Sequence, residues 1–414
     1  MGVMDPSRLA FSPERCADLH NQLLAKATEH IPNVRIERTL LARFLDAAPE
    51  FAEVPSLDDL PLCRFLRLVD TTSVVANGGV DLLTPFMYQP DPQSFWTDRI
   101  GHEPSFILLY GQNNSDSPID GGVYIDIRSY HAVWHSGNSP GFPSSESDQW
   151  LPLEVILQKA LDAWDTGKFY WDTQESTMKV RSWTEHDVEE SVAAFYRLIS
   201  SIEVRMPAED SEAHIHSRLE PLDAQALAPF KISAFAVKFL TTANRPSFSF
   251  VAPGIRVLTP QLLDEIYGTE ASNSVRRSHW LGDDEEWPTL ILPGVDPVPH
   301  NVSQSPNQNI NSFDQNWGFG KFTVNRQSGL YIMPDVDHSD LVRFVASSGL
   351  CTACEFQSPC RWDPPREPRL AEVFDHWASL VENGTWAVGV NGVSTDHSWF
   401  TAYTSRAQIA SSTN

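Results

Sequence analysis

Residues 105–132 read SFILLYGQNNSDSPIDGGVYIDIRSYHA, which predicts two strands joined by a long polar loop. The first strand is the apolar run FILLY. In the second, Val123, Ile125 and Ile127 alternate with other residues, a pattern typical of a half-buried strand. The loop between them is rich in Asn, Asp, Gly, Pro and Ser, the residues that favour turns. This stretch therefore predicts a β-hairpin, and with it a sheet in the fold.

Helical patterns are equally clear elsewhere in the chain. Thr184 precedes Asp187 by three residues, as in a capping box, and an apolar stripe at helical spacing follows it. Three more helices are expected to begin at Pro13, Pro152 and Pro260, and others over residues 35–45 and 365–384. Helices and strands along one chain predict a mixed α and β fold, either α/β or α+β.

The length of 414 residues predicts more than one hydrophobic core, because single cores stop growing at roughly 250–300 residues. We expect two closely packed lobes. Polar loops suggest the divisions, which are an N-terminal α+β lobe over 1–140, a central α/β region over 141–295, an exposed loop over 296–316 and a C-terminal hairpin and helix region over 317–414. Within the last region, residues 321–335 are expected to form a hairpin.

Composition excludes several classes of protein. Hydrophobic residues make up 41% of the chain, with 13 Trp and 22 Phe, so the sequence is not that of a disordered protein. No apolar run reaches the roughly 18–20 residues of a membrane span, and the first residues do not have the pattern of a secretion signal. We therefore expect a cytoplasmic protein with reduced thiols at its five cysteines.

The net charge of −24 works against unspecific binding to phosphate backbones. The charge is nevertheless uneven along the chain. Residues 231–277 hold six basic against three acidic residues, and this basic island is followed by the acidic run Asp283-Asp284-Glu285-Glu286. Charge runs are commonly solvated loops. Crowded carboxylates can also act as general bases or bind a cationic group, so both readings stay open.

A second pattern would suit non-haem iron. His338 and Asp340 match the first half of a two-histidine, one-carboxylate triad, with His397 or His376 as the distal ligand. Arg406 follows at a distance where it could hold the carboxylate of 2-oxoglutarate. The alternative function is therefore an Fe(II)/2-oxoglutarate-type oxygenase of a biosynthetic pathway.

Other short patterns carry less information. Cys351, Cys354 and Cys360 are three thiols where a structural zinc site needs four ligands. The pattern G-x-S-x-G at 137–141 lies in a polar, proline-rich loop instead of between a strand and a helix. Phosphate-binding glycine motifs are absent from the sequence, so we expect no nucleotide cofactor. The function we expect below also needs no other cofactor and no metal.

Three stretches resemble a family of filamentous-fungal proteins encoded beside secondary-metabolite pathways. They are WLPLEVILQKALDAWDTGK at 150–168, RPSFSFVAPGIRVLTPQ at 245–261 and PPREPRLAEVFDHWASLVENGTWAVGVNGV at 364–393. We identify this family as one that includes the arginine-containing cyclodipeptide synthases. Such enzymes use an acidic DDxxE motif. Here Asp283 and Asp284 supply the paired Asp, whereas Trp287 occupies the fifth place and the nearest Glu are Glu285 and Glu286.

The resemblance implies a tRNA-dependent synthase of cyclo-Arg-Xaa diketopiperazines in fungal secondary metabolism. Its partners would be arginyl-tRNA and a second aminoacyl-tRNA. The implied catalytic residues are Asp283, Asp284 and Glu286, and the implied tRNA-binding residues are Arg256, Arg276 and Arg277. A non-catalytic interaction protein is the alternative from another functional class.

Overall fold

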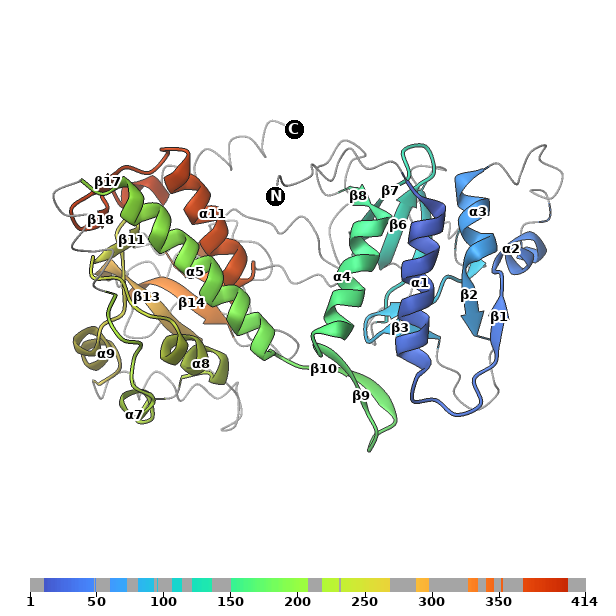
Figure 1. Ribbon diagram of the computed structural model, residues 1–414, viewed down its shortest axis with the longest axis horizontal. Helices are drawn as coiled ribbons and strands as arrows, with labels where there is room; N and C mark the ends of the chain where they lie inside the picture. Colours follow the sequence, from blue (N-terminus) through green and yellow to red (C-terminus); the bar gives the residue numbers. More distant parts are fainter. Residues whose placement is uncertain are drawn as a thin grey trace, which may run out of the picture. The chain divides into compact units, whose positions relative to one another are not determined.

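The computed structural model describes residues 11–47, 49, 60–72, 81–92, 95, 106–113, 121–135, 150–207, 218–230, 232–268, 288–297, 327–333, 340–345, 351–352 and 368–400. These residues form two compact units, one ending at Arg181 and the other beginning at Ser182 (Figure 1). Each unit combines helices with sheet, so the mixed α and β fold class is confirmed. None of the helices in the described ranges has the length and apolar character needed to cross a membrane.

The division at 181/182 differs from the one expected at 140/141. Strand β8 (Leu151–Pro152) pairs with β7 (His131–His135), and helix α4 (Leu153–Asp165) packs against α1 (Pro13–Thr28). Residues 150–181 therefore belong to the first unit. Most of the loop expected over 296–316 lies outside the described residues.

The first unit packs helices against a four-stranded antiparallel sheet of order β5-β6-β7-β8. The predicted hairpin is confirmed, because β5 (Phe106–Gly111) pairs antiparallel with β6 (Gly122–Asp126). The remaining elements of this unit are α2 (Leu41–Ala47), α3 (Pro61–Leu68), β1 (Ile36–Arg38), β2 (Asp70–Thr72), β3 (Leu82–Thr84), β4 (Met87–Tyr88), β9 (Phe169–Asp172) and β10 (Thr177–Val180). The buried faces of α1, α3 and α4 form one core with this sheet.

Helices α1 and α4 begin where the sequence predicted, whereas α3 was not predicted and α2 was predicted only in part. The Ser12 hydroxyl accepts a hydrogen bond from the Arg15 N–H, which caps α1. The helix expected over 35–45 is wrong in its first part, because residues 36–38 form β1 and pair with β2. Thr39 has a φ of +77°, a left-handed conformation that separates this strand from α2.

The second unit is built on an eight-stranded sheet of order β16-β15-β14-β13-β12-β11-β18-β17. All neighbouring strands are antiparallel except β11 and β18, which are parallel. The strands are β11 (Phe250–Ala252), β12 (Ile255–Arg256), β13 (Thr289–Pro297), β14 (Gln327–Met333), β15 (Leu341–Val345), β16 (Cys351–Thr352), β17 (Val388–Gly389) and β18 (Gly392–Val393). The hairpin expected over 321–335 is wrong, because β14 has β13 and β15 as its two neighbours.

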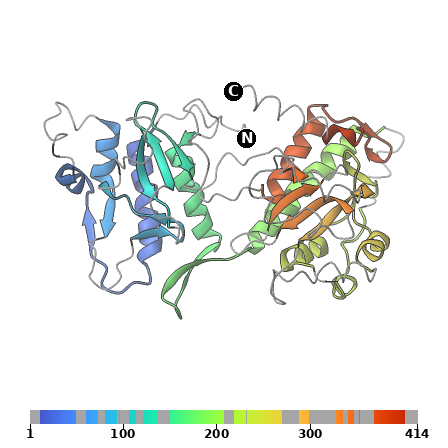
Figure 2. The same cartoon turned by 180° about the vertical axis from the view of Figure 1, so that it is seen from behind.

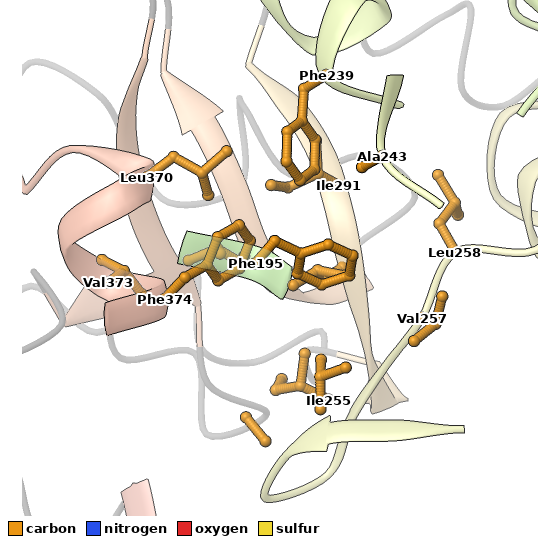
Figure 3. Packing of buried hydrophobic residues seen from close by; sticks show 14 of the residues in the cluster. Phe195, Phe239, Ala243, Ile255, Val257, Leu258, Ile291, Leu370, Val373 and Phe374 are labelled. Atoms are coloured by element: carbon orange, nitrogen blue, oxygen red, sulfur yellow. The ribbon is translucent and has the colours of Figure 1, made fainter. Parts of the chain in front are cut away.

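Helices α5 (Glu185–Arg205) and α11 (Leu370–Glu382) cover one face of this sheet, in front of the strands in Figure 1 and behind them in Figure 2. The other helices of the unit are α7 (Ala224–Leu227), α8 (Ala234–Thr242) and α9 (Pro260–Tyr267). In the core, Phe195 of α5, Phe239 of α8 and Phe374 of α11 pack ring against ring, with centroids 5.1–5.9 Å apart (Figure 3). The apolar stripe predicted for α5 is thus core packing.

Candidate functional site

Five of the six residues predicted for the site lie outside the described residues. These are Arg276, Arg277, Asp283, Asp284 and Glu286. They belong to residues 269–287, which connect α9 to β13. The two ends of this connection meet, because the Tyr267 hydroxyl at the end of α9 donates to the backbone oxygen of Leu290 in β13 at 3.0 Å.

The start of β13 is also held from another side. The Thr289 side chain is fully buried, and its hydroxyl oxygen accepts a hydrogen bond from the backbone N–H of Ser233 at 3.0 Å. The end of α9 and the start of β13 are therefore both fixed in the second unit. Both the basic pair and the acidic run of the prediction fall in the sequence between them.

Arg256 is the one predicted site residue that the structure describes. It lies in β12, and its Nη2 donates to the backbone oxygen of Gly294 in β13 at 3.1 Å. Its Nε is buried and has no hydrogen-bond partner among the described residues. Arg256 therefore links two strands, a contact that its position in the basic island did not indicate.

Two other described cations of the basic island are bonded within the second unit. Lys238 forms an ion pair with Glu185 at 3.0 Å. The Nε of Arg245 donates to the backbone oxygen of Glu220 at 2.9 Å, and burial lowers the pKa of Arg245. The described cations of the island therefore make intramolecular contacts, and Arg276 and Arg277 lie outside the described residues.

A small hollow opens beside Arg256, between the β11–β12 turn, the end of β13 and residues 396–400. Its volume is about 20 Å³, and its lining includes Asp296, Ser328, Phe344, His397 and Phe400. Nε2 of His397 lies 3.7 Å from Oδ2 of Asp296, and both side chains are 51% exposed. The hollow thus combines a solvent-accessible carboxylate and imidazole with aromatic walls.

Gly254 allows His397 to sit in this hollow. Its φ is +67°, a conformation that L side chains rarely adopt, and a Cβ added to it would lie 2.6 Å from the Cβ of His397. On the other wall, the Ser328 hydroxyl donates to the backbone oxygen of Asp296. The Ser328 hydroxyl is therefore committed to the backbone, and the three side chains do not form a Ser-His-Asp triad.

A buried charge cluster joins α5, α11 and β15. The guanidinium of Arg369 contacts Asp340 through Nε at 2.5 Å, Asp187 through Nη2 at 2.5 Å and Glu190 through Nη1 at 3.1 Å. Asp340 is fully buried and Asp187 is 6% exposed. Burial lowers the pKa of Arg369, but the attraction of the carboxylates, that of Asp340 first, raises the pKa more.

This cluster bears on the iron alternative. The carboxylate of Asp340 is engaged by Arg369 in the interior, whereas His397 is half exposed and lies beside Asp296. His338 and Arg406 lie outside the described residues, as do Cys354, Cys360 and residues 137–141. Across the part of the chain that the structure describes, no three His, Cys, Asp or Glu side chains are grouped to hold a metal ion. The geometry therefore gives the iron triad no support.

Sequence reasoning missed a buried polar cluster in the first unit. His20 of α1 is fully buried, with Nε2 2.9 Å from the backbone oxygen of Asp70 and Nδ1 3.2 Å from the hydroxyl of Tyr110. A carbonyl can only accept, so Nε2 carries the proton and Nδ1 accepts from Tyr110. Burial lowers the pKa of His20 to about 4, and burial raises that of the nearby Cys16 thiol to about 12. Neither group is suited to catalysis at neutral pH.

His20 makes the first unit sensitive to acid. The unfolded chain binds a proton at His20 near its ordinary pKa of about 6.5, whereas the folded chain does so only near 4. Stability should therefore be constant above pH 6.5 and fall by about 3 kcal/mol as the pH drops to 4. Hydrogen exchange of α1 amides, corrected for intrinsic rates, measures this loss.

Two variants isolate the contribution of His20. In His20→Gln the amide can replace both hydrogen bonds without titrating, so most of this pH dependence should disappear. His30→Gln, at an exposed position, should keep it. Equal pH dependence in wild type and His20→Gln would contradict the assignment to His20.

No family model, no curated protein and no solved structure matches this chain. Its function must therefore be argued from its own residues.

Proposed function

We propose that this chain is a tRNA-dependent cyclodipeptide synthase that makes cyclo-Arg-Xaa diketopiperazines in fungal secondary metabolism. The three stretches that resemble this family support the proposal. Two of them, 245–261 and 364–393, contain β11 and β18, which lie side by side in the sheet through the pair Phe250 and Gly392. Two of the resembling stretches are therefore neighbours in the sheet of the second unit.

The observation that carries the proposal is the closed connection between α9 and β13. Residues 269–287 hold the paired aspartates, Glu286 and the two adjacent arginines, and the hydrogen bond from Tyr267 to Leu290 joins their ends. Segments that connect the elements of a rigid scaffold are common carriers of catalytic residues. The acidic groups proposed for catalysis and the two arginines proposed for tRNA binding belong to this one connecting segment of the sequence.

The proposed chemistry needs no cofactor, because an aminoacyl ester is already activated. The α-amine of one aminoacyl group attacks the ester carbonyl of the other, an amide bond forms, and the tRNA hydroxyl leaves. A second aminolysis closes the ring and releases the second tRNA. Asp283, Asp284 and Glu286 would accept the protons lost by the attacking amines and deliver them to the leaving oxygens.

The tRNA backbone would be bound by Arg276 and Arg277, together with Arg256 of β12. Phosphate contacts supply most of the affinity for nucleic acids and weaken as salt rises. Because the net charge of −24 repels phosphates, the tRNA would be confined to the surface around these arginines. We propose a cytoplasmic location, because the aminoacyl-tRNAs that the protein would use are in the cytoplasm.

The proposal is tested with purified protein, arginyl-tRNA and a mixture of other aminoacyl-tRNAs. Mass spectrometry should detect an arginine-containing diketopiperazine. Asp283→Ala combined with Asp284→Ala should lower its rate of formation at least a hundredfold, within the range of about 10²–10⁴ that acid–base groups contribute.

The matched control carries Asp264→Ala and Glu265→Ala, which remove an adjacent, exposed acidic pair on α9. Its rate should equal that of wild type. An unchanged rate in the Asp283/Asp284 variant would show that the acidic run is a solvated loop and that the proposed site is wrong.

A further inference from the structure

Strand β1 has a neighbour on one side only. It pairs antiparallel with β2, and no other strand in the described ranges pairs with it. In Figure 1, β2 lies between β1 and α1. The backbone N–H of Asp70 in β2 donates to Asn21 of α1, and the backbone oxygen of Asp70 accepts from His20, both at 2.9 Å. The backbone N–H of Thr72, also in β2, donates to the side chain of Gln89 at 3.0 Å.

These bonds show which backbone groups of β1 face outward. In an antiparallel pair, alternate residues exchange both of their backbone hydrogen bonds with the partner strand. The two β2 residues use their backbone groups elsewhere, so the bonded pair is Glu37 with Thr71. The N–H and C=O groups of Ile36 and Arg38 therefore point away from β2. No backbone partner for them lies in the part of the chain that the structure describes, so β1 has an open edge.

The side chains along this open edge carry charges of both signs. Arg35, Ile36 and Arg38 are exposed, Ile36 by 44%, and Glu37 is partly buried. Neither arginine nor Glu37 forms an ion pair with another residue of the described ranges. Native proteins often place lysines or other charges on an edge strand to prevent pairing. The order Arg, Ile, Glu, Arg instead permits one register of pairing between two copies of β1.

The positions of the charges select that register. Two copies of β1 form backbone hydrogen bonds only when outward-facing residues lie opposite each other. With Ile36 opposite Ile36 of the second copy, each Arg35 lies directly opposite a Glu37, in pairs without backbone hydrogen bonds, whose side chains are close. Each neighbouring register places Arg35, Glu37 or Arg38 opposite the same residue of the second copy, and like charges directly opposite each other are destabilising. The register centred on Ile36 is therefore favoured.

We propose that β1 binds a second copy of this chain, by antiparallel pairing of the two β1 strands about a two-fold axis at Ile36. Antiparallel pairing of identical strands closes a dimer, because both copies use the same surface. The dimer would be held by two backbone hydrogen bonds between the Ile36 residues, by the contact of their side chains and by two ion pairs of Arg35 with Glu37. So small an interface gives a weak, reversible dimer. Its formation does not depend on the proposed function.

Sedimentation equilibrium of the full chain over a range of protein concentrations tests the proposal. Wild type should show a monomer–dimer equilibrium. Arg35→Glu and Glu37→Arg should each weaken the dimer about tenfold or more, because each replaces two opposite-charge pairs by two like-charge pairs. Glu265→Arg makes the same change of charge at an exposed position on α9 and should dimerise like wild type.

A mixture of the two β1 variants tests the register itself. In a dimer of one Arg35→Glu chain with one Glu37→Arg chain, both opposite-charge pairs are restored. The equimolar mixture should therefore dimerise about tenfold more tightly than either variant alone, which also shows that both variants are folded. Four results would each overturn the proposal: wild type that stays monomeric at every concentration, β1 variants that dimerise like wild type, a mixture no tighter than its components, or a Glu265→Arg chain as weak as Glu37→Arg.

Discussion

Replacing Arg369 by Met is expected to destabilise the second unit by about 3–5 kcal/mol, the usual cost of leaving buried charges without their partner. Asp340 and Asp187 are both buried, and each accepts a hydrogen bond from the Arg369 guanidinium at 2.5 Å. Asp187 also accepts bonds from the backbone N–H and the hydroxyl of Thr184, so it cannot turn away to find water without uncapping α5. The loss should appear in hydrogen exchange of α5 and α11 amides.

Arg197 supplies a matched control for this prediction. It also joins α5 to α11, through Asp375 at 2.9 Å and Glu382 at 2.8 Å, but all three side chains are 43–51% exposed. Exposed ion pairs contribute about 0–1 kcal/mol, so Arg197→Met should cost no more than that. Equal losses in Arg197→Met and Arg369→Met would contradict the account of a buried charge cluster.

The other large effect is expected for Trp377→Ala, at about 3–5 kcal/mol, the range measured when large aromatic side chains are removed from cores. Trp377 is 2% exposed on the inner face of α11. Its ring lies 5.9 Å from that of Trp386 and 6.1 Å from that of Phe374, so alanine would leave a cavity between α11 and the segment that follows it. Chemical denaturation, followed by exchange of the same α11 amides, measures the loss.

Val204→Ala is the control for this cavity. Val204 is on α5 in the same unit but is 81% exposed. The substitution should therefore change the stability of this unit by less than about 0.5 kcal/mol. A loss for Trp377→Ala below about 1 kcal/mol would show that the core closes around the missing ring and that the packing described here is not tight.

Local signals in the sequence predicted α1, α4, α5, α9 and α11, whereas α3, α7 and α8 were not predicted. Thr184 and Asp187 form the capping box that their three-residue spacing indicated, and α9 begins after Thr259 and ends at Gly268 as expected. Such signals act within one helical turn, so they can be read from neighbouring residues. The apolar stripe of α5 is likewise a property of its own sequence.

Contacts between distant residues could not be predicted in the same way. The second oxygen of Asp187 binds Arg369, 182 positions away, and nothing near either residue indicates this pairing. The order of the eight-stranded sheet depends on similar long-range pairing, which explains why residues 321–335 were mistaken for a hairpin. Strand β14 carries an apolar run buried between two other strands, and such a run does not specify its neighbours.

The candidate site was likewise predictable only in part. Sequence alone pointed to residues 276–286, because charge runs are visible without a fold. It did not indicate that a hydrogen bond joins the end of α9 to the start of β13. Nor did it indicate that His397 lies next to both Asp296 and Gly254. His397 and Asp296 lie 101 positions apart in the sequence and carry no motif, so only the fold brings them together.

The most direct test of the proposed function is the metabolite profile of a clean yeast or fungal host that expresses this chain alone and is fed isotope-labelled arginine. We predict a new metabolite with the mass of a cyclo-Arg-Xaa diketopiperazine that carries the label and is lost in the variant with Asp283→Ala and Asp284→Ala. Absence of any labelled diketopiperazine from a host that accumulates the folded chain, while an authentic synthase produces one in parallel, would contradict the proposal.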